Sequence, residues 1–256
     1  MKSAFIFPGQ GSQTVGMGKE LYDNFAVARE VFNAVDAALG EKLSDTIFFG
    51  PQETLTLTQN AQPAIMATSI AALRVLEAET GFKVSDAKFV AGHSLGEYSA
   101  LCAAGSISLA ETARLLRVRG NAMQQSVPAG LGAMAALIGV DTEQAERIAA
   151  EASGEDVCNV ANDNGGGQVV ISGAKPAVER AVEIAKAKGV KRAVMLDVSA
   201  PFHCALMAPA AGIMDAALRA ATIHAPIIPV VANVTAAQET DPETIRQLLV
   251  DQVTGM

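Results

Sequence analysis

The sequence has no long apolar run, few cysteines and no excess of positive charge. A helix needs roughly 20 apolar residues to span a bilayer, and the apolar stretch at the N-terminus is too short for a secretory signal. Lys and Arg number 19 against 27 Asp and Glu, whereas a general nucleic-acid binder needs a basic surface. We therefore expect a soluble, cytoplasmic protein that binds neither nucleic acid nor membrane.

The three cysteines and three histidines are too scattered to indicate a metal site or a disulfide framework. Cys102, Cys158 and Cys204 lie in separate parts of the chain, and we expect each to be a small buried side chain. No group of residues has the spacing of metal ligands. We therefore expect no metal and no tightly bound cofactor.

The sequence does contain enough apolar residues for a sizeable core. Of its 256 residues, 50% are hydrophobic and 18% are charged, which excludes wholesale disorder and fits one large domain or two small ones. Short apolar stretches, such as residues 3–7 and 88–92, alternate with helical patterns. One helix is expected from about residue 63, with Pro63 in its first turn. The alternation predicts an α/β fold with a mostly parallel sheet.

Residues 130–199 have an organisation of their own. Their pattern predicts the order strand, helix, strand, strand, helix, strand, which is that of a ferredoxin-like unit. Asp141 or Thr142 is expected to cap the first of these helices. We therefore expect a small domain at residues 130–199, inserted into a large α/β domain made of residues 1–129 and 200–256.

The sequence Gly92-His93-Ser94-Leu95-Gly96 has the G-x-S-x-G pattern, between a predicted strand and a predicted helix. A nucleophile elbow requires this context, because its tight turn exposes a serine oxygen above the strand ends. The same pattern also occurs in ordinary strand–helix loops. The context nevertheless makes Ser94 the candidate nucleophile.

A serine nucleophile needs a base, and the chain offers only His93, His203 and His224. His93 adjoins the serine, where neighbouring side chains diverge, and His224 has the pattern of a surface or strand-entry residue. His203 follows a strand end, where parallel-sheet folds place catalytic groups, and the order serine-then-histidine is that of hydrolase-like folds. The residue that would orient His203 stays open between Asp197, in a predicted strand, and Gln252, on the last predicted helix.

A second glycine-rich loop follows the first predicted strand. Its sequence, Phe7-Pro8-Gly9-Gln10-Gly11-Ser12-Gln13, lacks the Gly-Lys-Ser/Thr ending of a P-loop and opens no helix at its last glycine. A loop at the carboxyl end of a strand can donate a backbone N–H to an oxyanion hole. Taken alone, this loop could equally be a simple turn.

Four motifs occur in order along the chain: Phe-Pro-Gly-Gln-Gly-Ser-Gln, Gly-His-Ser-Leu-Gly-Glu at 92–97, Arg119-Gly120 and Pro201-Phe202-His203. Together they closely resemble the malonyl-CoA:acyl carrier protein transacylases, to which the acyltransferase domains of fatty acid and polyketide synthases are related. The resemblance covers nearly the whole chain and implies a hydrolase-like core with a ferredoxin-like insertion. Family members continue well past the final Gln-Val-Thr-Gly-Met, so the large domain is expected to be incomplete at its C-terminal end.

The resemblance implies a role for each catalytic residue. Ser94 matches the nucleophile that accepts the acyl group, and His203 matches its general base. Gln10 and Leu95 match the positions whose backbone N–H groups form the oxyanion hole. Gln252 resembles the residue that supports the histidine, through its main-chain carbonyl.

The resemblance also implies how the substrate is bound. Arg119 matches the arginine that binds the malonyl carboxylate, and Gly120 would let another backbone approach it closely. His93 and Asn162 match positions that line the pocket. The bulky Phe202 resembles the pattern of family members that select malonyl over branched units.

The implied activity is transfer of a malonyl group from malonyl-CoA to the phosphopantetheine thiol of acyl carrier protein, through a malonyl-serine intermediate. The expected partners are acyl carrier protein and a coenzyme A thioester, in fatty acid biosynthesis, with a polyketide role left open. The chain is expected to be a monomer. The rival interpretation is a serine esterase or thioesterase, which would need a carboxylate behind the histidine and no arginine in the acyl pocket.

Overall fold

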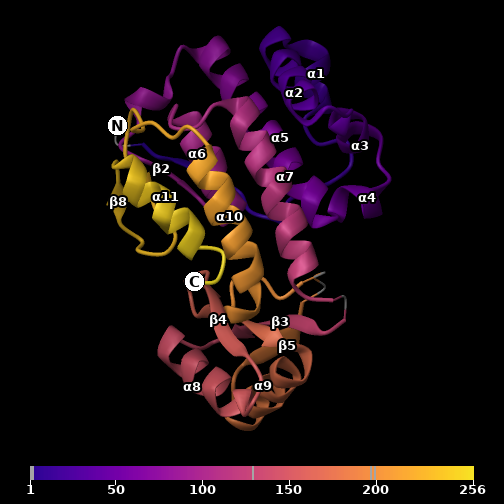
Figure 1. Ribbon diagram of the computed structural model, residues 1–256, viewed down its shortest axis with the longest axis vertical. Helices are drawn as coiled ribbons and strands as arrows, with labels where there is room; N and C mark the ends of the chain where they lie inside the picture. Colours follow the sequence, from indigo (N-terminus) through magenta and orange to yellow (C-terminus); the bar gives the residue numbers. More distant parts are fainter. Residues whose placement is uncertain (1–2, 129, 197, 199) are drawn as a thin grey trace. The chain divides into compact units, whose positions relative to one another are not determined.

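The computed structural model describes residues 3–128, 130–196, 198 and 200–256, which fall into two units. The first unit comprises Met1–Asn121 and Met214–Leu248, and the second comprises Ala122–Ile213 and Leu249–Met256. The second unit is thus wider than the segment 130–199, because it also includes flanking residues and a piece of the C-terminal region. Figure 1 shows the helices and strands of each unit.

The first unit is built on a mostly parallel sheet. Strands β1 (Phe5–Phe7), β2 (Val90–Gly92) and β7 (Val230–Val231) run parallel with β2 in the middle, and β8 (Gln238–Glu239) pairs antiparallel with β7. The parallel strands end at one edge, so the loops that follow them meet there. The prediction of an α/β fold with a mostly parallel sheet is confirmed.

A short buried helix packs on this sheet, and a long helix packs on that one. Helix α6 (Leu95–Ala103) packs on β1 and β2 with all its residues buried, and α5 (Thr58–Thr80) packs on α6 and on α2 (Ala26–Leu39). The remaining helices that lie wholly or partly in this unit are α1 (Lys19–Asn24), α3 (Leu43–Phe49), α4 (Gln52–Thr56), η1 (Val84–Asp86), α7 (Leu109–Ser126), α10 (Ala208–Ala220) and α11 (Pro242–Asp251). Among the residues described, no helix is both long and apolar enough to cross a membrane.

The expected start of α5 was wrong. Pro63 lies inside the helix rather than in its first turn. The helix begins earlier because the main-chain oxygen of Leu57 accepts the N–H groups of Asn60 and Ala61, each at 2.8 Å. Proline inside a helix removes one N–H and crowds the carbonyl four residues earlier, and the burial of the neighbouring side chains outweighs this cost.

The second unit holds a four-stranded antiparallel sheet in the order β4-β5-β3-β6. In chain order its elements are β3 (Gly132–Ile138), α8 (Thr142–Ser153), β4 (Cys158–Asp163), β5 (Gln168–Ala174), α9 (Lys175–Ala187) and β6 (Arg192–Met195), followed by η2 (Ala205–Met207). Alternate residues of β3, namely Ala133, Ala135 and Leu137, join the core that α8 and α9 complete. Asp141 caps α8, since its carboxylate accepts the N–H of Gln144 at 2.7 Å.

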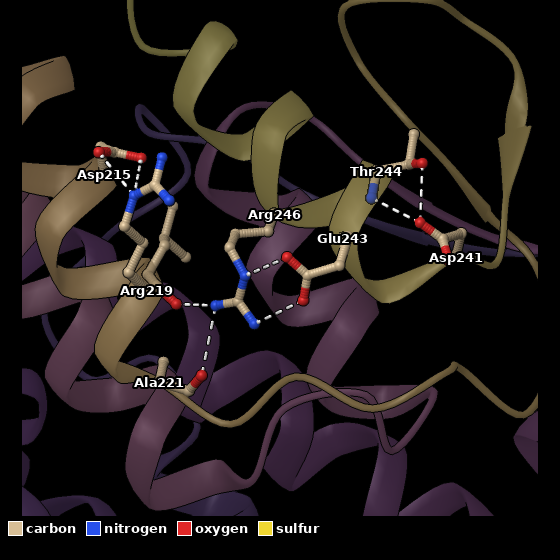
Figure 2. Close-up of polar contacts among 8 residues, drawn as sticks. Asp215, Arg219, Ala221, Asp241, Glu243, Thr244 and Arg246 are labelled. Atoms are coloured by element: carbon tan, nitrogen blue, oxygen red, sulfur yellow. Dashed lines mark hydrogen bonds and ion pairs between the residues drawn. The ribbon is translucent and has the colours of Figure 1, made fainter.

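Figure 2 shows how α10 and α11 are joined within the first unit. Arg246 of α11 donates to the main-chain oxygens of Leu218 and Ala221, at the C-terminal end of α10, and pairs with Glu243 at 3.3 Å. Carbonyls in the last turn of a helix and just after it lack the full set of intrahelical partners, so the arginine provides a donor for them. The link fixes the start of α11 against α10.

Asp241→Ala should lower the Tm by a few degrees at neutral pH, because it removes the cap of α11. The Asp241 carboxylate accepts the N–H and the hydroxyl of Thr244, each at 2.8 Å, and these bonds hold its pKa below the ordinary value. A lowered pKa contributes stability that is present above the unfolded-state pKa and is lost as the pH falls through the folded-state pKa. The difference between wild type and variant should therefore shrink in acid, measured by thermal unfolding from pH 7 to pH 3.

Asp241→Asn is the matched control, because asparagine caps helices as well as aspartate does but does not titrate. It should keep most of the wild-type Tm at neutral pH. Equal losses for the alanine and asparagine variants would show that the cap at residue 241 is not what stabilises α11.

Candidate active site

Ser94 lies in a strained turn between β2 and α6. Its backbone has φ 53° and ψ −109°, in the left-handed half of conformational space that non-glycine residues seldom adopt. A Cβ atom at Gly92 would lie 1.9 Å from the main-chain oxygen of Gly96, and one at Gly96 would lie 2.5 Å from that of Phe7. Both positions therefore require glycine, and the strand–turn–helix context predicted for the G-x-S-x-G pattern is confirmed.

The loop after β1 lies against this turn. A Cβ atom at Gly9 would be 2.5 Å from Nδ1 of His93 and 2.9 Å from its main-chain oxygen, so the loop passes directly beside the turn. Gln10 follows in this loop and donates through Nε2 to Thr58 Oγ1 at 3.2 Å. Leu95 is the first residue of α6, where an N–H has no acceptor within the helix. Leu95 thus adjoins Ser94, and Gln10 lies in the loop that passes beside His93.

Arg119 of α7 reaches Ser94 from the other side. The arginine is 1% exposed, and its Nη2 donates to Ser94 Oγ at 3.0 Å. Its Nη1 donates to Oε1 of Gln62, on α5, at 2.8 Å. Arg117, two residues earlier, instead pairs with Glu41, because side chains two positions apart point to different sides of a helix.

The environment of Arg119 is almost dry. Burial lowers the pKa of Arg119, and the neighbouring Tyr98 and Glu97 partly offset that effect. The ring of Tyr98 lies 5.6 Å from the guanidinium carbon, and burial raises the pKa of Tyr98 to about 12. Because Tyr98 stays neutral at pH 7, it presents an aromatic face to the cation rather than a counter-charge.

Gly120 makes this position of Arg119 possible. A Cβ atom at Gly120 would lie 2.5 Å from the Cα atom of Gln59 and 2.8 Å from the main-chain oxygen of Thr58. The backbones of α7 and α5 therefore touch here, which confirms the close approach predicted from the sequence Arg119-Gly120. The contact brings Gln62 within reach of the guanidinium.

Two polar residues at the site were missed in the sequence. Gln62 is 1% exposed on α5, and the sequence offered no signal that singles it out, because Gln59 and Asn60 lie close to it in the chain. Asn233 follows β7 and accepts the N–H of Ser94 through Oδ1 at 2.7 Å. Its position at the carboxyl end of a parallel strand was the available signal.

His203 and Gln252 lie together in the second unit. Nδ1 of His203 is 2.7 Å from the main-chain oxygen of Gln252, and the histidine is 6% exposed with φ 56°. A carbonyl oxygen only accepts hydrogen bonds, so Nδ1 carries the hydrogen and Nε2 of the neutral ring keeps its lone pair. Of the two alternatives for the supporting group, Gln252 makes the contact, and Asp197 lies outside the described residues.

The three remaining candidates differ in exposure. His93 is exposed and donates its main-chain N–H to Phe7 at 3.1 Å. Phe202 is buried in the second unit next to His203, and Asn162 is half-buried on β4, opposite Val170 of β5. All three cysteines are buried and free, as expected. Within the described parts of the chain, no three His, Cys, Asp or Glu side chains gather as metal ligands.

Comparison with known proteins identifies the family. Residues 4–252 match the acyl transferase domain. The chain belongs to the acyl transferase domain family. This confirms the family expected from the four motifs, and the acyl transferase match extends over both units.

Individual acyl transferase relatives are close in sequence and structure. The chain is 47% identical to the malonyl CoA-acyl carrier protein transacylase of Bacillus subtilis over 253 residues, which are 98% of this chain and 78% of that protein. An acyl-carrier-protein-S-malonyltransferase from Bartonella henselae is 61% identical with a TM-score of 0.96, covering 100% of this chain and 81% of that one. A malonyl-transacylase in complex with its type II PKS acyl-carrier protein matches with a TM-score of 0.95 and 43% identity, covering 100% and 82%.

Proposed function

We propose that this chain transfers the malonyl group of malonyl-CoA to the phosphopantetheine thiol of acyl carrier protein, through a malonyl ester on Ser94, in fatty acid biosynthesis. The observation that carries the proposal is the buried guanidinium of Arg119, whose Nη2 lies 3.0 Å from Ser94 Oγ. The relatives named as malonyl transacylases and malonyltransferases support it. The acyl-carrier-protein complex of one of them supports the choice of acceptor.

The position of Arg119 suits a short acyl group that ends in a carboxylate. In a malonyl ester, only two carbon atoms separate the serine oxygen from the free carboxylate carbon. A guanidinium beside Oγ can therefore pair with that carboxylate through two parallel N–H bonds. Arg119 Nη2 already donates to Ser94 Oγ, so the guanidinium lies within reach of an acyl group carried on that oxygen.

The reaction consists of two acyl transfers. His203 takes the hydroxyl proton of Ser94 as Oγ attacks the thioester carbonyl, then returns the proton to the departing coenzyme A sulfur as the C–S bond breaks. The carrier's thiol gives its proton to His203 and attacks the ester, and Ser94 leaves and recovers the proton. We assign the N–H groups of Leu95 and Gln10 to the oxyanion of each tetrahedral intermediate; one such donor is typically worth about 3–4 kcal/mol.

A neutral partner is sufficient for His203. The main-chain oxygen of Gln252 fixes the ring's orientation and tautomer without adding a charge. A thiolate is a much better leaving group than an amide nitrogen, so less stabilisation of the imidazolium is needed. A serine esterase or thioesterase is the alternative, and the proximity of Arg119 to Ser94 favours the transfer of malonyl over it.

We also propose the finer organisation of the protein. Residues 130–199 would form a ferredoxin-like domain inserted into a hydrolase-like domain of residues 1–129 and 200–256; the chain order and antiparallel sheet of the second unit support this. His93 and Asn162 would line the acyl pocket. The chain would act as a cytoplasmic monomer. It would need no tightly bound cofactor, since the proposed chemistry uses only its own side-chain and main-chain groups.

Intact-mass measurement after mixing with malonyl-CoA tests the proposal. The protein should gain one malonyl group, located on the peptide that contains Ser94. Phosphopantetheinylated acyl carrier protein should then remove it and become malonylated, whereas the carrier without its thiol should leave it in place. An esterase would lose the group to water at one rate with either form of the carrier, and that result would overturn the proposal.

Phe202→Ser should raise methylmalonyl transfer relative to malonyl transfer, because we propose that Phe202 limits the size of the acyl group. Excluding one methyl group is typically worth only about 1–3 kcal/mol, so the wild-type preference should be partial. The ratio of the two kcat/KM values measures the effect. An unchanged ratio would mean that Phe202 does not face the acyl group.

A further inference from the structure

The strained turn at Ser94 is held by a side chain from a distant part of the first unit. Oδ1 of Asn233 accepts the N–H of Ser94 at 2.7 Å, and Nδ2 of the same side chain donates to the main-chain oxygen of Gly92 at 2.7 Å. One carboxamide therefore bridges the two residues on either side of His93. An asparagine can do this because its amide has an acceptor and a donor side by side.

This bridge continues the pairing of the parallel sheet. Strand β7 pairs with β2 only as far as Val231 opposite Ala91. In a parallel ladder, each paired residue bonds to two residues of the neighbouring strand, which are two positions apart. It accepts the N–H of one and donates to the C=O of the other. The Asn233 side chain makes this pair of bonds to Ser94 and Gly92, just after β7 has ended. The turn is thereby paired like a strand although its backbone has left the strand conformation.

Asn233 is itself held in place from α6. Its main-chain N–H donates to Oε2 of Glu97 at 3.1 Å, and Glu97 is 1% exposed. Glu97 lies in the first turn of α6, and its own N–H donates to the main-chain oxygen of Ser94 at 3.0 Å. The sheet, the turn and the helix are thus tied together around one residue.

This arrangement has a consequence for the oxyanion. The N–H of Ser94 is committed to Asn233, so it does not point toward a substrate carbonyl above the turn. The N–H of Leu95, the next along the chain, is then the donor that the turn can present. The direction of that N–H depends on the peptide planes that the Asn233 carboxamide fixes.

We propose that Asn233 is a positioning residue for the acyl transfer. It holds the Ser94 peptide so that Oγ and the Leu95 N–H keep the geometry that the tetrahedral intermediate needs. The inference rests on the proposed function of Ser94 as nucleophile. It predicts that loss of the carboxamide slows the chemical step and leaves the binding of malonyl-CoA nearly intact.

Asn233→Ala and Asn233→Asp test this role. Aspartate keeps the shape and the acceptor for the Ser94 N–H, but it places an oxygen against the main-chain oxygen of Gly92, so it should also be impaired. We expect kcat for malonyl transfer to fall about 100-fold in both, with KM for malonyl-CoA within about threefold of wild type. Asn24→Asp is the control, because Asn24 also donates to a main-chain oxygen, that of Glu20, on the surface of α1.

Single-turnover acylation and labelling with a fluorophosphonate separate the possible outcomes. Both rates should fall with kcat in folded Asn233 variants, because the fluorophosphonate reports the reactivity of the serine without needing malonyl recognition. If Asn233→Ala does not fold, the isosteric Asn233→Asp carries the test. A folded variant with wild-type labelling and kcat, or one in which only KM rises, would overturn the inference. A wild-type protein that is labelled but accepts no malonyl group would instead contradict the proposed function.

Discussion

Ser94→Ala should take up no malonyl group from malonyl-CoA in the intact-mass experiment and should transfer none to acyl carrier protein. The substitution removes the only atom that we propose bonds to the acyl group. We therefore expect no acyl-enzyme at all, rather than slower formation of it. The turn itself should survive. Its shape depends on Gly92, Gly96 and the bonds to the Ser94 main chain, none of which involves Oγ.

The variant should stay folded with only a modest loss of stability. The change deletes one oxygen from a half-buried side chain and one hydrogen bond from Arg119, and a bond to a charged group contributes typically about 1.5–3 kcal/mol. Thermal unfolding checks this. Ser69→Ala, at a half-buried serine in α5, is the matched control and should be acylated like the wild type. Malonylation of Ser94→Ala at the wild-type rate would show that another residue is the nucleophile.

The turn at Ser94 could be predicted from the sequence because its determinants are local. Gly92, Ser94 and Gly96 are close in the chain and form one recognisable pattern, and the clash that requires Gly92 lies within the turn; only the clash at Gly96 involves a distant residue, Phe7. The pattern could therefore be recognised without knowing which distant elements pack together. Helical geometry alone also points Arg117 and Arg119, two residues apart, to different sides of α7.

Gln62 and Asn233 could not be predicted because their contacts are distant in the sequence. Gln62 meets Arg119 across 57 positions, and Asn233 meets Ser94 across 139. The first contact depends on Gly120 bringing two helices together, and the second depends on the residue at which β7 ends. The place of Asn233 after a strand marks it as a candidate, but no local feature of either residue identifies its partner.

The boundaries of the smaller helices and strands could not be predicted from the sequence either. Strands β7 and β8 contain two residues each, too few for any alternation of apolar and polar side chains to show. The helix α5 was expected to start near Pro63, but it starts earlier, because its burial outweighs the N–H that the proline lacks. By contrast, the strands and helices between β3 and β6 have clear periodicity and a core of their own.

Arg119→Ala should lower kcat/KM for malonyl transfer far more than for acetyl transfer. Malonyl differs from acetyl by one carboxylate, and a buried site must replace the water that this charge loses. Removing one partner of a buried charge pair typically costs about 2–5 kcal/mol, which corresponds to a loss of roughly 30-fold or more. Acetyl transfer should fall less or even rise, because an acetyl group has no carboxylate for the guanidinium to hold.

Two further variants separate recognition of the carboxylate from a structural role of the arginine. Arg119→Lys keeps the charge but not the planar fork, so it should restore malonyl transfer only in part. Arg114→Ala, on the same helix, removes an arginine that is 52% exposed and paired with Glu111, and it should leave both acyl groups unaffected. The measurement is kcat/KM for both substrates in each folded variant. Equal losses for malonyl and acetyl in Arg119→Ala would mean that Arg119 supports the fold around Ser94, and another group would then have to recognise the carboxylate.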